Sequence, residues 1–152
     1  MSDLDETDRR ILRALQRDAS LSMDALANAV HLSRNACWRR MRRLEEAGVL
    51  RARVALVDAQ AAGCGQEVLV LIRASAHAPD WLDRFARTVR TLPQIVAAYR
   101  MAGELDYVLR VRVADVAGYD AFYKVLIAEV PLADITASFV MEHIKDTTEL
   151  PL

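Results

Sequence analysis

Cysteine, glycine, proline and aromatic residues are all scarce in this chain of 152 residues, which has 2 cysteines, 5 glycines, 4 prolines and 6% aromatic side chains. Because hydrophobic residues make up 53% of it, the chain can bury a core and is neither disordered nor collagen-like. So few cysteines indicate a reducing compartment rather than a disulfide scaffold. The composition predicts one ordinary domain or two small ones.

Long hydrophobic runs are missing as well. The longest aliphatic run, residues 68–72, is far shorter than the roughly 20 residues that cross a bilayer. Residues 2–10 are acidic and polar, where a leader peptide would be basic and then apolar. We therefore expect no membrane segment, no signal peptide and a cytoplasmic location.

The spacings that metal and catalytic sites need are absent too. None of the three histidines (His31, His77 and His143) is spaced to form a ligand pair with either cysteine. Cys37 lies on the apolar stripe of a predicted helix, which favours a core role. Cys64, in a linker, is the better candidate of the two for a reactive thiol, although a spacer role is favoured. We expect no catalytic residue, no metal and no cofactor.

Positive charge is concentrated in one short window. The whole chain has 20 basic and 21 acidic residues, and this near-neutral balance argues at first against a nucleic-acid partner. Residues 31–53, however, hold seven arginines and only two glutamates, whereas residues 1–30 and 54–152 are both net acidic. A charge run is usually a solvated helix face, so its position in the fold must decide its meaning.

The first sixty residues predict a helix-turn-helix. A helix begins at Asp5 and ends near residue 19, and Ser22 caps a short helix over 23–30. A three-residue turn follows, and Ser33 caps a third helix over 34–47, with Gly48 just beyond its end. A tight turn between the second and third helices is typical of DNA-binding motifs.

The third predicted helix has one apolar and one basic face. Cys37, Met41 and Leu44 share a stripe that must face the other helices. The opposite side suits a DNA major groove, because arginine matches guanine or phosphate and asparagine matches adenine. A solvated protein-interaction helix is the alternative. The predicted DNA-contacting residues are Ser33, Arg34, Asn35, Trp38, Arg39, Arg42 and Arg43.

Residues 49–57 alternate like a strand, with Arg51 and Arg53 on one side. This segment is either a wing that adds phosphate contacts, for which both arginines are candidates, or a linker strand. Residues 58–65 are rich in alanine and glycine and form a linker. The expected domains are therefore 1–57, which binds DNA, and 66–152.

Residues 66–152 contain an internal repeat at an offset of 38. Each copy has a strand, a helix that opens on an aromatic residue (Trp81 or Tyr119), a proline stop (Pro93 or Pro131) and a further strand, over 95–101 or 135–144. Two such halves predict a four-stranded antiparallel sheet with both helices on one face, the ferredoxin-like βαββαβ fold. The chain as a whole is then α+β. Paired sets on the open face (Leu69/Leu71, Val108/Arg110, Phe139/Met141) predict that another subunit covers it.

Residues 101–107 join the two middle strands of this predicted sheet. Gly103 suits a tight hairpin that needs a positive φ, and a plain turn is the simplest interpretation. A second interpretation is a zwitterion site, in which hairpin amides hold a carboxylate and Asp106 holds an ammonium group.

The ordered motifs resemble those of the leucine-responsive/asparagine-responsive (Lrp/AsnC, feast/famine) regulators over essentially the whole chain. They are Asp5-x-x-Asp8 with Ile11, Leu12 and Leu15, then Leu32-Ser33, Cys37-x-Arg39-Arg40-Met41-x-Arg43-Leu44-Glu45-x-x-Gly48-Val49, and Gly103-x-x-Asp106-Tyr107. The resemblance implies a winged helix-turn-helix that binds double-stranded DNA, an amino-acid-sensing domain for transcriptional control, and homodimers that assemble to tetramers, octamers or larger on the nucleoid.

The resemblance also implies where an amino-acid effector binds, at a contact between dimers. The implied residues are Met101, Gly103, Glu104, Leu105, Asp106 and Tyr107, with Thr136 and Ser138 on the last strand. Residues 100–107 and 138–145 resemble a cysteine-responsive subgroup that activates cysteine-degrading genes. The chain departs from many relatives at Arg34 and Ala36, where they carry prolines, and at Trp38, where they have a smaller residue.

Two other classes compete with a DNA-binding regulator. An enzyme is the main rival, since ferredoxin-like folds also host catalysts, but the sequence lacks the residue spacings that a catalytic or metal site needs. A protein-interaction adaptor is the second rival. The salt dependence of DNA binding distinguishes it from a regulator.

Overall fold

A computed structural model describes residues 4–152, which divide by their contacts into two units. The first unit extends to Ala55 and also includes Lys145–Leu152, and the second is Leu56–Ile144. The chain therefore returns to its first unit after the second is complete. The expected division, with one domain ending at residue 57 and the other continuing to residue 152, did not foresee this return.

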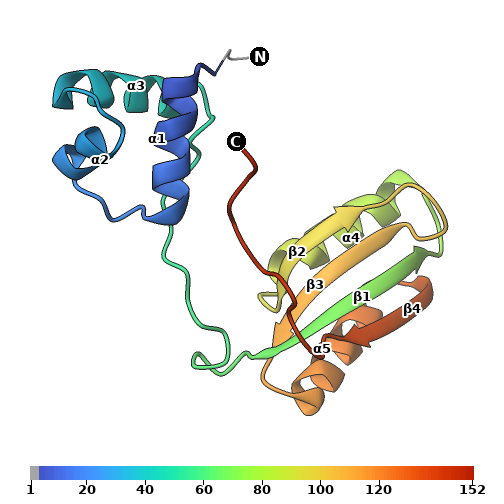
Figure 1. Cartoon of the computed structure of the whole chain (residues 1–152). Helices are drawn as coiled ribbons and strands as arrows, with labels where there is room; N and C mark the ends of the chain where they lie inside the picture. Colours follow the sequence, from blue (N-terminus) through green and yellow to red (C-terminus); the bar gives the residue numbers. More distant parts are fainter. Residues whose placement is uncertain (1–3) are drawn as a thin grey trace. The chain divides into compact units, whose positions relative to one another are not determined.

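The first unit contains three helices, α1 (Glu6–Arg17), α2 (Met23–Ala29) and α3 (Arg34–Glu46) (Figure 1). Side chains cap all three as the sequence predicts. Asp5 forms a reciprocal capping box with Asp8, and the hydroxyls of Ser22 and Ser33 accept backbone N–H bonds at 3.2 and 3.3 Å. Gly48 follows α3 with φ of 68°, the left-handed conformation that ends a helix at low cost.

A small core joins these helices. Its buried members repeat at helical spacing, and they are Ile11, Leu12, Leu15, Leu26, Ala27, Val30, Cys37, Met41 and Leu44. Leu152, from the returning segment, packs against the same cluster. Gln16 exchanges two hydrogen bonds with the backbone of Leu150, and Arg13 donates to the carbonyl of Leu152 at 2.7 Å. The returning segment is thus part of this unit's packing.

The second unit is the predicted βαββαβ fold. Its strands are β1 (Gln66–Ala74), β2 (Ile95–Arg100), β3 (Tyr107–Val113) and β4 (Leu132–Phe139), in the order β2-β3-β1-β4 with every neighbouring pair antiparallel. Helices α4 (Pro79–Thr91) and α5 (Val116–Glu129) lie on the same face of the sheet (Figure 1). Each helix ends two residues before a proline, Pro93 or Pro131, as the repeat predicts.

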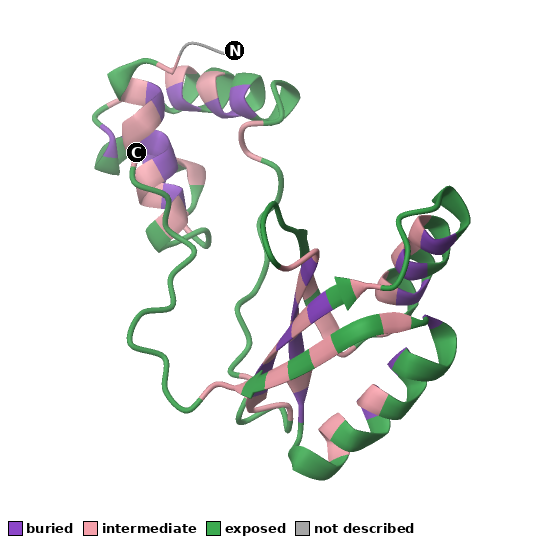
Figure 2. Ribbon diagram, turned by 90° about the vertical axis from the view of Figure 1, so that its right-hand side faces the viewer, coloured by how far each residue is buried: buried purple, intermediate pink, exposed green. Residues whose placement is uncertain are grey.

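The core of this unit lies between the sheet and the two helices. The seven residues of β3 alternate strictly between buried and half-buried (Figure 2). Trp81, Phe85 and Tyr107 form an aromatic group in which the last two rings are 4.4 Å apart. The alternation places residues 69, 71, 108 and 110 on the opposite, open face, as expected.

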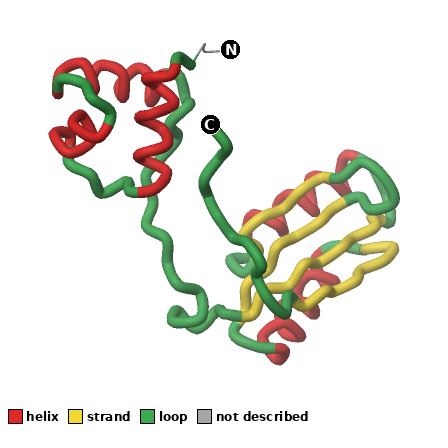
Figure 3. Tube along the Cα trace, in the orientation of Figure 1, coloured by secondary structure: helices red, strands yellow, loops and turns green. Residues whose placement is uncertain are grey.

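Three expectations about strands were wrong. Residues 49–57 form no strand; they are loop (Figure 3), because no neighbouring segment within the described part of the chain offers them a hydrogen-bonding ladder. The last strand, expected over 135–144, ends at Phe139. Phe139 pairs with the inward-facing Val68 and contacts Tyr119 edge-on, so it lies on the helix side of the sheet rather than on the open face.

The open face carries both apolar and charged side chains in two cross-strand rows. One row is Tyr99, Val108, Leu71 and Thr136, and the next is Ala97, Arg110, Leu69 and Ser138. Beside them Arg112 pairs with Glu67, which is only 9% exposed. None of the helices in residues 4–152 is long and apolar enough to cross a membrane.

Candidate functional sites

Helix α3 presents its basic side to solvent, as predicted. Asn35 and Arg39 are exposed opposite the buried Cys37–Met41–Leu44 stripe. Within the described residues neither side chain has a hydrogen-bonding or ionic partner. Both are therefore available to an outside ligand without first breaking an internal contact.

The other predicted DNA-contacting residues of α3 and its flanks are partly engaged. Arg42 forms an ion pair with Glu46 at 3.1 Å and lies 5.8 Å from the ring of Trp38, which is 53% exposed. Arg34 is 3.5 Å from Asp24. These pairs are solvent-exposed and contribute little to stability, so an incoming phosphate can displace them.

The segment after α3 contributes one engaged and one unengaged arginine. Arg53 pairs with Glu45 at 3.0 Å, which ties residue 53 back to the end of α3. Arg51 is exposed and has no ion pair among residues 4–152. The side chain of Ser33 is the N-cap of α3, so its hydroxyl is already used locally.

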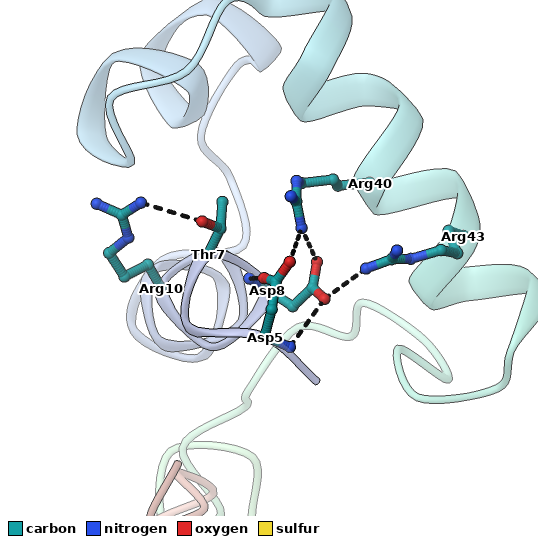
Figure 4. A network of polar contacts seen from close by, with 6 residues as sticks. All are labelled: Asp5, Thr7, Asp8, Arg10, Arg40 and Arg43. Atoms are coloured by element: carbon teal, nitrogen blue, oxygen red, sulfur yellow. Dashed lines mark hydrogen bonds and ion pairs between the residues drawn. The ribbon is translucent and has the colours of Figure 1, made fainter. Parts of the chain in front are cut away.

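Asp8 connects α1 to α3 and was missed as a site residue by sequence reasoning. Its carboxylate is fully buried and receives Arg40 on Oδ1 at 2.9 Å and Arg43 on Oδ2 at 2.5 Å (Figure 4). Asp5 receives the same Nη1 of Arg40 at 2.6 Å. Arg43, expected to contact DNA, therefore leans back toward α1. The sequence signal was Asp5-x-x-Asp8, which predicted only the helix cap.

The arginine contacts change the acidity of this network. The hydrogen bond from Arg40, followed by the backbone N–H of Asp8, lowers the pKa of Asp5 from 3.8 to about 2. The hydrogen bonds of Arg40 to the carboxylates of Asp5 and then Asp8 raise the pKa of Arg40. Both groups are consequently charged over the whole physiological range.

A cavity of about 370 Å³ lies along α3 beside this network. Its lining residues on α3 recur at i, i+3, i+4 and i+7, so they share one side of the helix. They are Ala36, Arg39, Arg40 and Arg43, and Leu32 also lines the cavity.

The hairpin over 101–106 is the second candidate site. Gly103 has φ of 133°, as the turn requires, and the N–H of Met101 bonds to the carbonyl of Asp106 at 2.8 Å. The carboxylate of Asp106 accepts the backbone N–H of Ala74 at 2.8 Å and lies 3.7 Å from Nε2 of His77. The N–H of Asp106 itself bonds to the carbonyl of Ile72 at 3.0 Å.

The remaining effector candidates lie around this hairpin on different faces. Glu104 forms an ion pair with Arg73 at the rim, Met101 is 46% exposed and Leu105 is half-buried. Tyr107 is buried among the aromatic residues of the core. Thr136 and Ser138 are exposed on the open face. One chain alone therefore does not bring all eight residues around a single ligand.

A second cavity, of about 430 Å³, lies where α4 begins, and sequence reasoning gave no signal for it. Ser75, Trp81 and Pro131 line this cavity. The carbonyl of Pro131 accepts a hydrogen bond from Oγ of Ser75 at 2.8 Å and another from Nε1 of Trp81 at 2.7 Å. Arg84 and Arg87 line it from α4.

Neither cysteine forms part of these sites. Burial raises the pKa of the Cys37 thiol, which keeps it protonated and unreactive in the first core. Cys64 is half-buried in the linker. Within residues 4–152 no group of three or more His, Cys, Asp or Glu side chains is placed to hold a metal.

Comparison with known proteins identifies both units. Residues 4–51 match the winged helix-turn-helix DNA-binding model, and residues 67–150 match the Lrp/AsnC ligand binding domain. The chain belongs to the Lrp/AsnC family. It is thus a DNA-binding transcriptional regulator with a ligand-binding domain, and not an enzyme. The α+β architecture and the family predicted from sequence are confirmed.

Individual Lrp/AsnC relatives are similar over nearly full length. The transcriptional activator DecR of Escherichia coli K12 is 48% identical over 150 residues, 98% of this chain and 99% of DecR. An AsnC family regulator from Agrobacterium tumefaciens has a solved structure with a TM-score of 0.94 and 49% identity, covering 97% of each chain. A Neisseria meningitidis regulator solved in complex with L-Met gives a TM-score of 0.93 at 33% identity, covering 98% of this chain and 97% of that one.

Proposed function

We propose that α3 reads DNA through Asn35, Arg39 and Arg42, with Trp38 at the edge of the contact and Arg51 on a flanking phosphate. The observation that carries this proposal is the exposure of Asn35 and Arg39 without any internal partner. Arginine forks and asparagine amides match base edges in the major groove, and Asn35, Arg39 and Arg42 lie on one side of α3.

The regulator acts as a dimer or a larger homo-oligomer. Two copies of α3 then face half-sites about one helical turn of DNA apart. The open face of the sheet is the proposed dimer surface, since Leu69, Leu71 and Val108 are apolar there and a second copy would cover them. Arg110, in the middle of this face, has no ion pair within the described chain, and a second copy can provide one.

The effector is an amino acid, and we propose cysteine. Residues 100–107 and 138–145 resemble the cysteine-responsive subgroup, and the similarity to an activator of 48% identity agrees with that choice. The Neisseria relative, solved with L-Met, also holds a sulfur-containing amino acid. By the same resemblance the protein activates cysteine-degrading genes and works in the cytoplasm on the nucleoid.

The effector binds beside the 101–107 hairpin at a contact between dimers, where Thr136 and Ser138 complete the site. In this arrangement Glu104 and the Oδ1 atom of Asp106 attract the ammonium group, and hairpin amides attract the carboxylate. A site shared between subunits makes binding depend on assembly, so the effector shifts the oligomeric equilibrium.

A screen of the twenty standard amino acids by thermal shift tests the effector proposal. A ligand that binds only the native state raises the melting temperature. We expect cysteine to give the largest rise, and methionine a smaller one. Equal shifts for all twenty, or a shift for an unrelated amino acid alone, would contradict cysteine. Light scattering with and without cysteine should report a change in mass from a dimer or larger, and a monomer at micromolar concentration would refute the assembly.

A further inference from the structure

The buried carboxylate of Asp8 fixes two arginines of α3 in place. Asp8 is 0% exposed, and its two oxygens are occupied by Arg40 and Arg43, with the N–H of Asp5 also on Oδ2 (Figure 4). A buried charge that loses its partners is strongly unfavourable. Arg40 and Arg43 therefore stay on Asp8 when an outside ligand approaches, and they cannot swing away to meet it.

Both arginines nevertheless keep donors for a ligand. Each guanidinium has five N–H donors, and Arg43 contributes one nitrogen to Asp8, as Arg40 does to its two carboxylates. The side chains remain 31% exposed for Arg40 and 58% for Arg43. Both line the cavity of about 370 Å³ that also includes the unpaired Arg39.

The charges around this cavity leave one positive charge uncompensated. Arg39, Arg40 and Arg43 carry three positive charges, and Asp5 and Asp8 carry two negative ones. A phosphodiester group carries a single negative charge and accepts several N–H bonds at once, which is the geometry that arginine forks match. No carboxylate lines the cavity itself.

We propose that this cavity holds one backbone phosphate of the bound DNA and that Asp8 is the positioning residue that directs Arg40 and Arg43 toward it. The proposal rests on the DNA-binding role of α3 and deepens it. Arg43 then contacts a phosphate and reads no base, whereas Asn35 and Arg42, on the other flank of α3, remain for base edges. Asp8 acts through the two arginines and does not touch DNA.

The salt dependence of binding to a duplex of random sequence tests this assignment, because each phosphate contact contributes about 0.9 to the slope of log affinity against log salt. For Arg43→Gln we expect the magnitude of this slope to decrease by about 0.9. The affinity then changes roughly eightfold less for each tenfold change in salt. Arg90→Gln, an exposed arginine at the end of α4, removes the same charge and should keep the wild-type slope.

Asp8→Asn separates positioning from simple neutralisation. If Asp8 positions the arginines, the salt-dependence slope of Asp8→Asn decreases in magnitude, even though this substitution makes the protein more positive. A steeper slope with tighter binding would show that Asp8 merely cancels charge, and an unchanged slope would show a role in folding alone; either result overturns the proposal. Should Asp8→Asn fail to fold by circular dichroism, Arg43→Gln alone decides, and an unchanged slope for that variant refutes the phosphate site.

Free phosphate is the other source of the same chemistry. Replacing chloride by phosphate at constant ionic strength should change wild-type DNA affinity by less than about twofold. Strong competition by phosphate that disappears in Arg43→Gln would assign the cavity to the free anion and overturn the DNA contact. Absence of DNA binding by the wild-type protein would refute the function of α3 itself, whereas normal binding with an unchanged Arg43→Gln slope refutes only the phosphate site.

Discussion

The carboxylate of Asp106 accepts the backbone N–H of Ala74 at 2.8 Å, so the hairpin between β2 and β3 is anchored to the end of β1. Sequence reasoning assigned this carboxylate to an effector ammonium group. The structure gives one oxygen, Oδ2, a structural partner and leaves Oδ1 beside His77 at 3.7 Å. Any effector role for Asp106 is consequently coupled to the position of the hairpin.

Two substitutions of Asp106 separate its structural contact from its charge. Asp106→Ala leaves the N–H of Ala74 without a partner and should lower the free energy of unfolding by about 1–3 kcal/mol. Asp106→Asn keeps an acceptor oxygen but removes the charge, so we expect near-normal stability and a loss of the thermal shift with cysteine. An undiminished cysteine response in Asp106→Asn would remove the carboxylate charge from the effector site.

Arg39→Ala tests the proposed DNA-reading face directly. Arg39 has no internal partner in the described chain, so its removal should leave the melting temperature unchanged and weaken DNA binding. We expect the slope against salt to fall by about 0.9, as for one lost phosphate, or the discrimination against a mismatched base to fall by about 1–3 kcal/mol if Arg39 contacts a base. Arg90→Ala serves as the control. Unaltered affinity at low salt would exclude Arg39 from the contact.

The helix caps were predictable from sequence because each depends on residues three positions apart. Asp5, Ser22 and Ser33 all cap as expected. The role of Asp8 was not predictable in the same way, since its partners lie 32 and 35 positions away on α3. The pattern Asp5-x-x-Asp8 is the same whether Asp8 serves only in a capping box or also binds arginines of another helix.

The wrong prediction of a strand over 49–57 also arose because the deciding partner is distant in the sequence. Alternating residues indicate that a segment can form a strand, but a strand exists only where another segment supplies hydrogen bonds. Leu56 and Val57 are 77% and 74% exposed, so their apolar side chains remain largely uncovered by residues 4–152. Phe139 was assigned to the wrong face because alternation along one strand does not determine which set of side chains faces the helices, whereas its pairing with Val68 does.

The acidity of Asp5 predicts how the link between α1 and α3 responds to pH. The pKa of Asp5 falls from 3.8 to about 2 on folding, so the stabilisation by its charge is complete above pH of about 4 and is lost as the pH falls toward 2. Carboxyl carbon shifts followed by NMR should give a midpoint of about 2 for Asp5. In Arg40→Gln that midpoint should rise toward 3.8.

Asp18 provides an internal control for this titration. The hydroxyl and backbone N–H of Ser20 lower its pKa without any contribution from Arg40. Its midpoint should therefore stay the same in Arg40→Gln. A wild-type Asp5 that titrates at its ordinary value would show that the bond from Arg40 does not persist in solution.

The returning segment Lys145–Leu152 should be part of the cooperative fold of the first unit. Gln16 donates to the carbonyl of Leu150 at 3.3 Å and accepts its N–H at 2.6 Å, so one side chain satisfies both backbone groups of that residue. Gln16→Ala should cost about 1 kcal/mol of stability and remove the hydrogen-exchange protection of the Leu150 amide. The neighbouring Arg17→Ala loses only an exposed contact of 3.8 Å to Glu149 and should change stability by less than about 0.5 kcal/mol. Residues 140–144 lie between the end of β4 and this segment, so the chain passes from the second unit back to the first there. Rapid exchange of the Leu150 amide in the wild-type protein would show that the segment is not docked on α1.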